Sequence, residues 1–133
     1  MTTRIATVGG GDVRIDDAAI EQLRTAIRGD VLRPSDHGYG ENPVFNAMHQ
    51  RRPALIVRCT GTADVIDVVK FARQHGILVA VRGGGHSVAG HSSCDGGMVI
   101  DLTRMLVFVL EFLERWGFIQ IVVVHDLNTI AIE

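Results

Sequence analysis

The amino-acid sequence predicts an α/β (α+β) fold, a small domain organised around a strand, a helix and a second strand. Three observations predict this fold class: short apolar runs, stretches with helical apolar spacing between them, and joints of only a few residues. The chain has 133 residues, of which 47% are hydrophobic and 21% charged, and this suits one modest globular domain. A formal net charge of -2 without any basic stretch argues against a nucleic-acid partner.

The first predicted element is a helix in the N-terminal segment. Asp16 and Asp17 can cap its start, and apolar residues recur at helical spacing until Gly29 ends it. Residues 30–52 then form a loop-rich stretch, because prolines and glycines interrupt it too often for a long element. The residues expected to pin this stretch down are Tyr39, Phe45 and Met48.

The clearest predicted unit lies in the middle of the chain. Residues 54–59 form a short apolar run that suits a buried strand, and the helix predicted to begin at Thr62 carries an apolar stripe. Gly76 is well placed to end that helix in a left-handed turn, and residues 77–81 form the next apolar run. Strand, helix and strand in this order imply two parallel strands joined by a right-handed crossover.

A loop dense in small residues follows from 82 to 97 and is closed by a predicted strand at 98–102. Gly83, Gly84 and Gly85 leave the carboxyl end of a strand, where backbone N–H groups without side chains suit a pyrophosphate. Taken alone, three glycines are more often a flexible turn. They are also contiguous and no helix pattern follows them, so they do not form the fingerprint of a Rossmann NAD site.

Two side chains with useful chemistry follow the glycines directly. His86 and Ser87 would place an imidazole and a hydroxyl where the phosphates or ring of a ligand approach the backbone. A zinc site formed by His86, His91 and Cys94 is an alternative, but no paired cysteines support it and we predict no metal. A serine hydrolase is disfavoured because Ser87 lacks the strand-turn-helix context of a nucleophile.

Three sequence motifs resemble one known family. They are Arg82-Gly-Gly-Gly-His-Ser, then Val-Ala-Gly-His, then Asp95-Gly-Gly-Met-Val-Ile-Asp-Leu-Thr-Arg104. This pattern resembles the flavin-attachment region of the FAD-linked oxidases with a PCMH or vanillyl-alcohol-oxidase type of FAD domain, as in berberine-bridge-enzyme-like proteins. The strand and helix that precede the loop resemble the same family, so the resemblance covers about half of the chain, from Pro53 to Met105.

The resemblance implies FAD as the cofactor, with the glycine-rich loop around its pyrophosphate and a covalent bond from His86 to the 8α-methyl carbon of the flavin. It also implies oxidation of a small organic substrate with dioxygen as the acceptor. We therefore expect the N-terminal part of an FAD-dependent oxidoreductase. The alternative is an inactive α/β fragment that binds no flavin and self-associates. The implied cofactor-binding residues are Arg82, Gly83, Gly84, Gly85, His86, Ser87, Gly90 and His91.

The expected organisation has three parts. Residues 1–52 form a helix and loop segment, residues 53–105 form the FAD-binding βαβ unit with its loop, and residues 106–133 form an atypical tail. The tail departs from the family pattern, and its apolar residues are expected to favour a homo-oligomer. Residues 106–113 of the tail could form a helix or a strand, whereas residues 121–124 favour a strand.

Location and redox state are expectations from composition. Charged residues interrupt the apolar run at 105–124, so we predict no membrane span. The N-terminus lacks the apolar core of a signal peptide, which favours the cytoplasm. Cys59 and Cys94 are too few for a disulfide-stapled domain, although a pair between them stays open.

Overall fold

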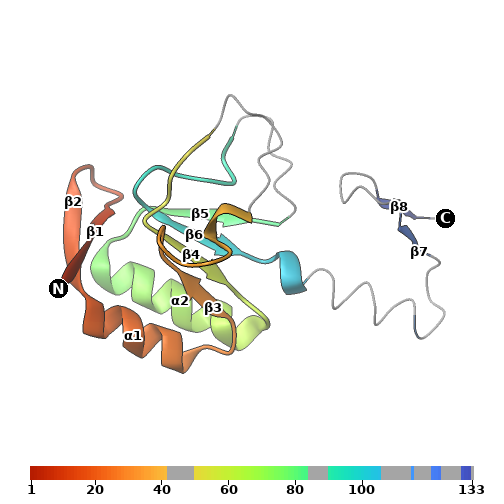
Figure 1. The fold of residues 1–133 in the computed structure, drawn as a ribbon, viewed down its shortest axis with the longest axis horizontal. Coiled ribbons are helices and arrows are strands. Elements are labelled where there is room, and N and C mark those ends of the chain that lie inside the picture. The colour runs from red at the N-terminus through yellow and green to blue at the C-terminus, as the bar shows by residue number, and fades with distance from the viewer. Residues whose placement is uncertain (42–49, 84–89, 106–114, 116–120, 124–129, 133) are drawn as a thin grey trace.

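The computed structural model describes residues 1–41, 50–83, 90–105, 115, 121–123 and 130–132. It confirms the α/β fold class: two helices cover one face of a four-stranded sheet, and an N-terminal hairpin lies at one end (Figure 1). The helices are α1 (Asp17–Ala26) and α2 (Thr62–His75), with a short 3-10 helix at Tyr39–Glu41. The strands are β1 (Thr2–Ala6), β2 (Asp12–Asp16), β3 (Asp30–Leu32), β4 (Leu55–Arg58), β5 (Val79–Arg82), β6 (Met98–Asp101), β7 (Ile121–Val123) and β8 (Ile130–Ile132).

The central sheet has the strand order β3-β4-β6-β5. β4 and β5 both pair in parallel with β6, and β3 pairs antiparallel with β4. The two strands joined by α2 are therefore parallel, as predicted, but they are not neighbours because β6 lies between them. The near-continuous apolar sequences of β4 and β6 are typical of parallel strands that are buried on both faces.

Both predicted helices form, and their ends follow local chemistry. The Asp16 carboxylate accepts a hydrogen bond from the Ala18 N–H at 3.1 Å and so caps α1. α1 ends at Ala26, slightly before the glycine that we expected to stop it. α2 ends at Gly76, whose φ of 63° is left-handed, so this predicted ending is confirmed.

The N-terminal segment contains strands where the sequence indicated only a helix and loop. β1 and β2 form an antiparallel hairpin around the glycines at 9–11, and two of these, Gly10 and Gly11, have φ of 85° and 81°. The Thr7 hydroxyl donates to the Gly10 carbonyl at 2.9 Å and fastens the turn. Glycines that we interpreted as a break are thus a hairpin turn, because left-handed φ is what such turns require.

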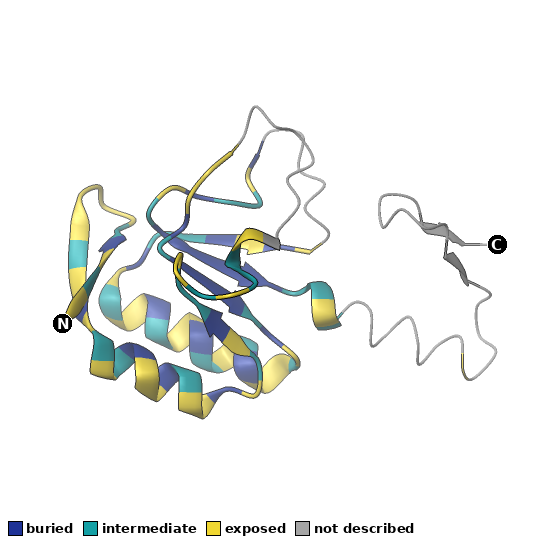
Figure 2. Ribbon diagram, viewed as in Figure 1, coloured by how far each residue is buried: buried dark blue, intermediate teal, exposed yellow. Residues whose placement is uncertain are grey.

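The sheet has an apolar cluster on each face. Figure 2 shows the buried residues of its strands in dark blue. The larger cluster lies under the helices and includes Ile20, Val57, Val68 and Ile100. The smaller cluster lies on the opposite face and consists of Ile56, Ala80, Cys94 and Val99, with Leu32, Tyr39 and Leu78 packed against it. The side chains of Val57 and Val68 are fully buried, and each such side chain stabilises the fold by about 1.5–3 kcal/mol.

The two cysteines lie in different clusters. Cys59 belongs to the cluster under the helices and Cys94 to the one on the opposite face, and both are buried free thiols. The disulfide that the sequence left open therefore does not form, because the sheet separates the two sulfur atoms. Burial raises the pKa of the Cys59 thiol to about 11, so it stays protonated at neutral pH.

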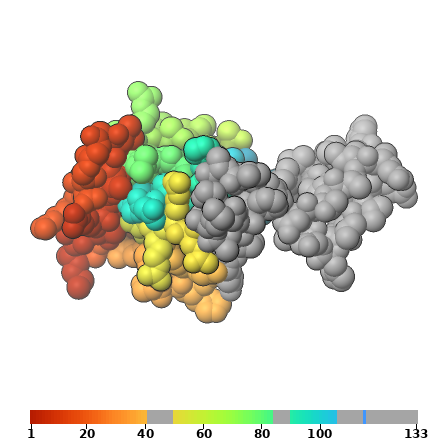
Figure 3. All heavy atoms as spheres, turned by 90° about the horizontal axis from the view of Figure 1, so that it is seen from above, coloured from red at the N-terminus to blue at the C-terminus, as the bar shows by residue number. Residues whose placement is uncertain are grey.

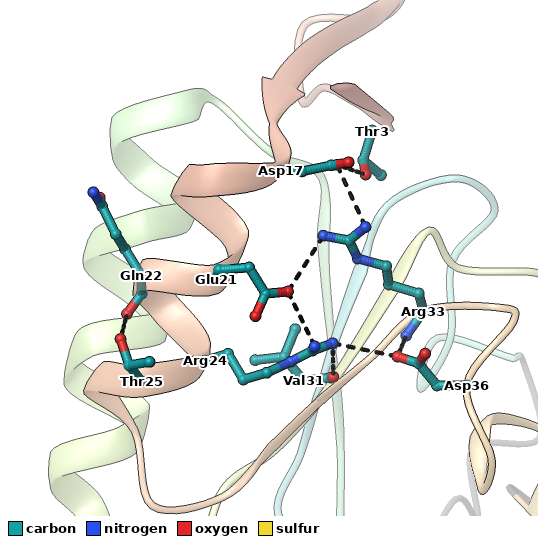
Figure 4. A network of polar contacts seen from close by, with 9 residues as sticks. All are labelled: Thr3, Asp17, Glu21, Gln22, Arg24, Thr25, Val31, Arg33 and Asp36. Atoms are coloured by element: carbon teal, nitrogen blue, oxygen red, sulfur yellow. Dashed lines mark hydrogen bonds and ion pairs between the residues drawn. The ribbon is translucent and has the colours of Figure 1, made fainter. Parts of the chain in front are cut away.

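A network of ion pairs joins α1 to the segment that follows β3 (Figure 4). Arg33 reaches Asp17 at 3.4 Å and Glu21 at 3.7 Å, while Arg24 reaches Glu21 at 3.0 Å and Asp36 at 3.3 Å. These side chains are partly exposed, so each pair contributes at most about 1 kcal/mol. The network therefore adds little to the free energy of unfolding, and its main effect is to orient α1.

Two further strands lie near the C-terminus. β7 and β8 pair antiparallel, and β7 confirms the strand predicted at this position. Residues 106–113, for which helix and strand were both open, lie outside the described residues, as do Phe45 and Met48. Among the helices that the structure describes, none has the length and apolar character needed to cross a membrane.

Candidate functional site

Three parallel strands end side by side at one edge of the central sheet. Arg58, Asp101 and Arg82 are in register, and each is the last residue of its strand. The Cys59 N–H donates to the Asp101 carbonyl at 2.9 Å, and the Leu102 N–H donates to the Arg82 carbonyl at 2.8 Å. The carboxyl edge of parallel strands is where α/β proteins bind ligands, so this edge is the first place to look for a site.

We call Arg58, Asp101 and Arg82 the charged row. They lie on the sheet face opposite the helices, because the residues two positions earlier in each strand belong to the smaller cluster. Two guanidinium groups accompany one carboxylate, so the charged row has a net positive charge at neutral pH. This charge suits an anionic ligand such as a pyrophosphate.

The charged row is largely shielded from water. Only 7% of Arg82 and 5% of Asp101 is exposed, while the Arg58 Nη2 donates to the Gly38 carbonyl at 2.9 Å. Burial lowers the pKa of Arg82 and nearby Arg58 lowers it further, whereas the Asp101 carboxylate opposes this effect. Asp101 thereby stabilises the charged form of a guanidinium that sits at the start of the glycine-rich loop.

The first glycine of the loop lies open at the end of β5. Gly83 is exposed, and a Cβ built on it would meet no atom within 4 Å. The Gly83 carbonyl accepts a hydrogen bond from the Thr103 hydroxyl at 2.7 Å. Open space beside a fixed backbone is the property that a phosphate needs to approach main-chain N–H groups.

The structure describes four of the eight residues that the sequence predicted for the site. Arg82 and Gly83 lie at the end of β5, and Gly90 and His91 lie where the loop returns. Gly90 is buried with a φ of 75°, a left-handed conformation that favours glycine, while His91 is exposed. The other predicted residues lie outside the described part of the chain: Gly84, Gly85, His86 and Ser87.

The returning part of the loop is fastened to the segment before β4. The Asp95 carboxylate accepts from the Arg52 N–H at 2.9 Å, and the Gly96 N–H donates to the Arg52 carbonyl at 2.8 Å. The Ala54 N–H donates to the Gly97 carbonyl at 2.8 Å. Figure 3 shows these two segments, in yellow and teal, side by side on the surface. Hydrogen bonds at both ends therefore position the loop.

The N-terminus of α2 also lies at the carboxyl edge, and its first turn carries the buried Asp64. The Asp64 carboxylate accepts from the N–H and hydroxyl of Thr60, each at 2.9 Å, and from the Arg28 and Gly29 N–H groups at 2.9 and 3.1 Å. Burial raises the pKa of Asp64, but these hydrogen bonds outweigh burial and hold the pKa below its usual range. The Asp64 carboxylate therefore satisfies donors of the segments before β3 and before α2 rather than binding a ligand.

Two other candidate sites find no support. Within the described ranges no three His, Cys, Asp or Glu residues come close enough to hold a metal ion, and His86 of the zinc alternative lies outside those ranges. A groove of about 250 Å³ between α2 and β5 is lined by apolar residues and Arg73. It offers too few hydrogen-bonding groups for a charged cofactor.

Sequence reasoning missed three residues of this site: Arg58, Asp101 and Thr103. All three lie in segments that we recognised, but none was assigned a role. Arg58 and Asp101 are the last residues of β4 and β6, and Thr103 lies two residues beyond β6. A row of polar residues at successive strand ends is the signal that marks such an edge.

This geometry defines a class of protein: an α/β domain that binds a phosphate-bearing cofactor at the carboxyl edge of its sheet. The chain belongs to the FAD binding domain family, whose model matches residues 53–121 and thus more than half of the chain. It is an FAD-binding domain of the FAD-linked oxidoreductases, and FAD is its cofactor. The open Gly83 and the positive charged row both fit the pyrophosphate of FAD.

Several relatives support this assignment. The chain is 38% identical over 81 residues to (R)-6-hydroxynicotine oxidase of Paenarthrobacter nicotinovorans, which covers 60% of this chain and 18% of the relative. It is 32% identical over 83 residues to berberine bridge enzyme-like 27 of Arabidopsis thaliana, covering 60% and 16% of the two chains.

Solved structures agree with the sequence relatives. The crystal structure of 6-hydroxy-D-nicotine oxidase from Arthrobacter nicotinovorans has a TM-score of 0.57 at 39% identity, covering 59% of this chain and 18% of the other. The Physcomitrella patens berberine bridge enzyme-like 1 structure has a TM-score of 0.58 at 27% identity, covering 64% and 19%. The chain thus spans about a fifth of the length of the relatives that it matches.

Proposed function

We propose that this chain holds the pyrophosphate of FAD in an oxidoreductase that oxidises a small organic substrate with dioxygen as the acceptor. The observation that carries the proposal is the open Gly83 beside the charged row at the carboxyl edge of β5. Backbone N–H groups of the glycine-rich loop would donate to the phosphate oxygens, and the two arginines of the charged row would supply the opposing charge.

The chemistry of the reaction comes from FAD, which when bound accepts a hydride equivalent from an organic substrate. The residues of this chain would bind the cofactor: Arg82 would balance its negative charge, and Asp101 stabilises the charged form of that guanidinium. We propose a covalent bond between His86 and the flavin, which the family resemblance implies and which would keep FAD attached through turnover.

The names of relatives support the proposed substrate class, and the family resemblance implies dioxygen as the acceptor; neither comes from this site. Two relatives are an oxidase of hydroxynicotine and a cytokinin dehydrogenase, whose names specify small organic molecules. A small organic substrate and dioxygen are therefore our proposal for the complete enzyme. The cytoplasmic location and the homo-oligomer stay predictions, since the tail residues expected to favour association lie outside the described residues.

The absorbance of the purified protein tests the proposal. After reconstitution with FAD, we expect visible absorbance typical of flavin, and we expect that colour to remain in the pellet after acid precipitation. His86→Ala should bind FAD but release all of it into the acid supernatant. The exposed His37 provides a matched control, and His37→Ala should behave as the wild type.

Two results would contradict the proposal. Flavin retained covalently by His86→Ala would remove that histidine as the attachment point. A folded wild-type protein that is colourless once unbound FAD has been removed would reject FAD binding by this chain and favour the alternative of a fragment that binds no flavin.

A further inference from the structure

The end of β6 makes a contact with the glycine-rich loop that the proposed function does not yet use. The Thr103 hydroxyl lies 2.7 Å from the Gly83 carbonyl, although 20 residues separate them in sequence. The same hydroxyl lies 2.6 Å from the Asp101 Oδ1, and the Thr103 N–H donates to that oxygen at 2.9 Å. Thr103 is thus held by its own strand end and reaches across to the neighbouring strand.

The hydroxyl has one proton and two acceptors facing it. A carbonyl oxygen and an ionised carboxylate can only accept, so the proton serves one of them at a time. Asp101 has other partners, because the Thr103 N–H donates to it and the charge of Arg82 lies nearby. The Gly83 carbonyl lies one residue beyond Arg82, the last paired residue of β5, and no other side chain in the described part of the chain donates to it.

We propose that Thr103 is a positioning residue that fixes the first peptide of the glycine-rich loop for FAD binding. Its donation to Gly83 sets the orientation of the peptide plane in which the loop leaves β5. Asp101 has two roles: it accepts hydrogen bonds that orient Thr103, and its negative charge balances the positive charge of Arg82. The expected effect of Thr103 on FAD binding rests on the proposed function, whereas its hydrogen bond to the start of the loop does not.

The test compares Thr103→Val, which keeps the shape of the side chain and loses the hydroxyl, with Thr103→Ser, which keeps the hydroxyl. Two properties of the full 133-residue chain are measured: backbone amide exchange in residues 83–90 without FAD, and the Kd for FAD from flavin fluorescence. We expect Thr103→Val to speed amide exchange and weaken FAD binding by about threefold to tenfold, the range of one hydrogen bond. Thr103→Ser should stay within about twofold of the wild type in both.

A matched control separates this role from general stability. The Thr25 hydroxyl donates to the Gln22 carbonyl at 2.9 Å on α1, so Thr25→Val also loses one hydroxyl-to-carbonyl bond. It should leave exchange in residues 83–90 and FAD binding unchanged, whatever its effect on the melting temperature.

The outcomes separate this inference from the proposed function. Unchanged exchange in Thr103→Val overturns the positioning role, as does equal loss in the Ser and Val variants. Faster exchange in Thr103→Val, with a wild type that does not bind FAD, supports the fixing of the loop and rejects the proposed function. Faster exchange together with unchanged FAD affinity overturns the link between loop position and cofactor binding.

Discussion

Asp64→Ala should lower the free energy of unfolding by about 3–5 kcal/mol, the loss expected when a buried charge that satisfies several donors is removed. Asp64 is 3% exposed, and its two oxygens accept four hydrogen bonds from Arg28, Gly29 and Thr60. Without the carboxylate, these donors lose their partner at the point where the end of α1 meets the start of α2. Urea unfolding followed by circular dichroism measures the change.

Asp67 provides the matched control for this prediction. It lies one turn further along α2 and is only half-buried, so Asp67→Ala also removes a carboxylate from the same helix. Its effect should stay within about 0.5 kcal/mol, as for most substitutions outside a buried network. Equal losses in the two variants would show that Asp64 acts through helix charge rather than through its buried contacts.

The same carboxylate predicts a pH dependence of stability. Hydrogen bonds hold the pKa of Asp64 below its usual range in the folded protein, so the unfolded chain takes up the proton first as the pH falls. The contribution of Asp64 is thus complete above the unfolded pKa of about 3.9 and is lost as the pH falls from there through the folded pKa. Unfolding midpoints below about pH 5 should fall more steeply in the wild type than in Asp64→Asn. Parallel curves would contradict this assignment.

Local signals in the sequence predicted the regular elements well. The helix at Thr62–His75 ends at Gly76, whose left-handed φ and N–H bonds to the last turn depend only on neighbouring residues, and its apolar stripe is likewise a local pattern. The strand runs at 54–59, 77–81 and 98–102 were each found to within two residues, because each is a short apolar run bounded by turn residues, which favours a buried strand. The glycine-rich loop was recognised by its motif rather than by its geometry.

The site depends on contacts between residues that are far apart in sequence, which no local sequence pattern predicts. Arg58, Asp101 and Arg82 meet only because β6 inserts between β4 and β5, and the order of strands follows from packing of the whole sheet. The Asp64 contacts with Arg28 and Gly29 span 36 and 35 residues, so a helix-start aspartate gives no sign of its distant donors. The hairpin at the N-terminus was missed because its glycines indicate a turn and a break equally well.

Gly29→Ala should have the second large effect, a loss of about 3 kcal/mol or more in the free energy of unfolding. A Cβ on Gly29 would lie 1.7 Å from the carbonyl oxygen and 2.9 Å from the carbonyl carbon of Arg58. Both are backbone atoms, so no side-chain rotation relieves the clash and β3 or the end of β4 must move. Since Arg58 belongs to the charged row, we expect FAD binding to weaken as well.

Gly9→Ala is the matched control for Gly29→Ala, because a Cβ on Gly9 meets no atom within 4 Å. Its unfolding free energy should stay within about 0.5 kcal/mol of the wild type. Asp64 holds the Gly29 N–H, and its Oδ2 would lie 3.3 Å from the new Cβ, so the two sites are coupled. Once Gly29→Ala has displaced this segment, the Asp64 bonds to it are already weakened, and the double variant Gly29→Ala with Asp64→Ala should lose less than the sum of the single losses. Strict additivity would mean that the Gly29 segment keeps its place and its Asp64 contacts, and that the clash is relieved by movement at the end of β4.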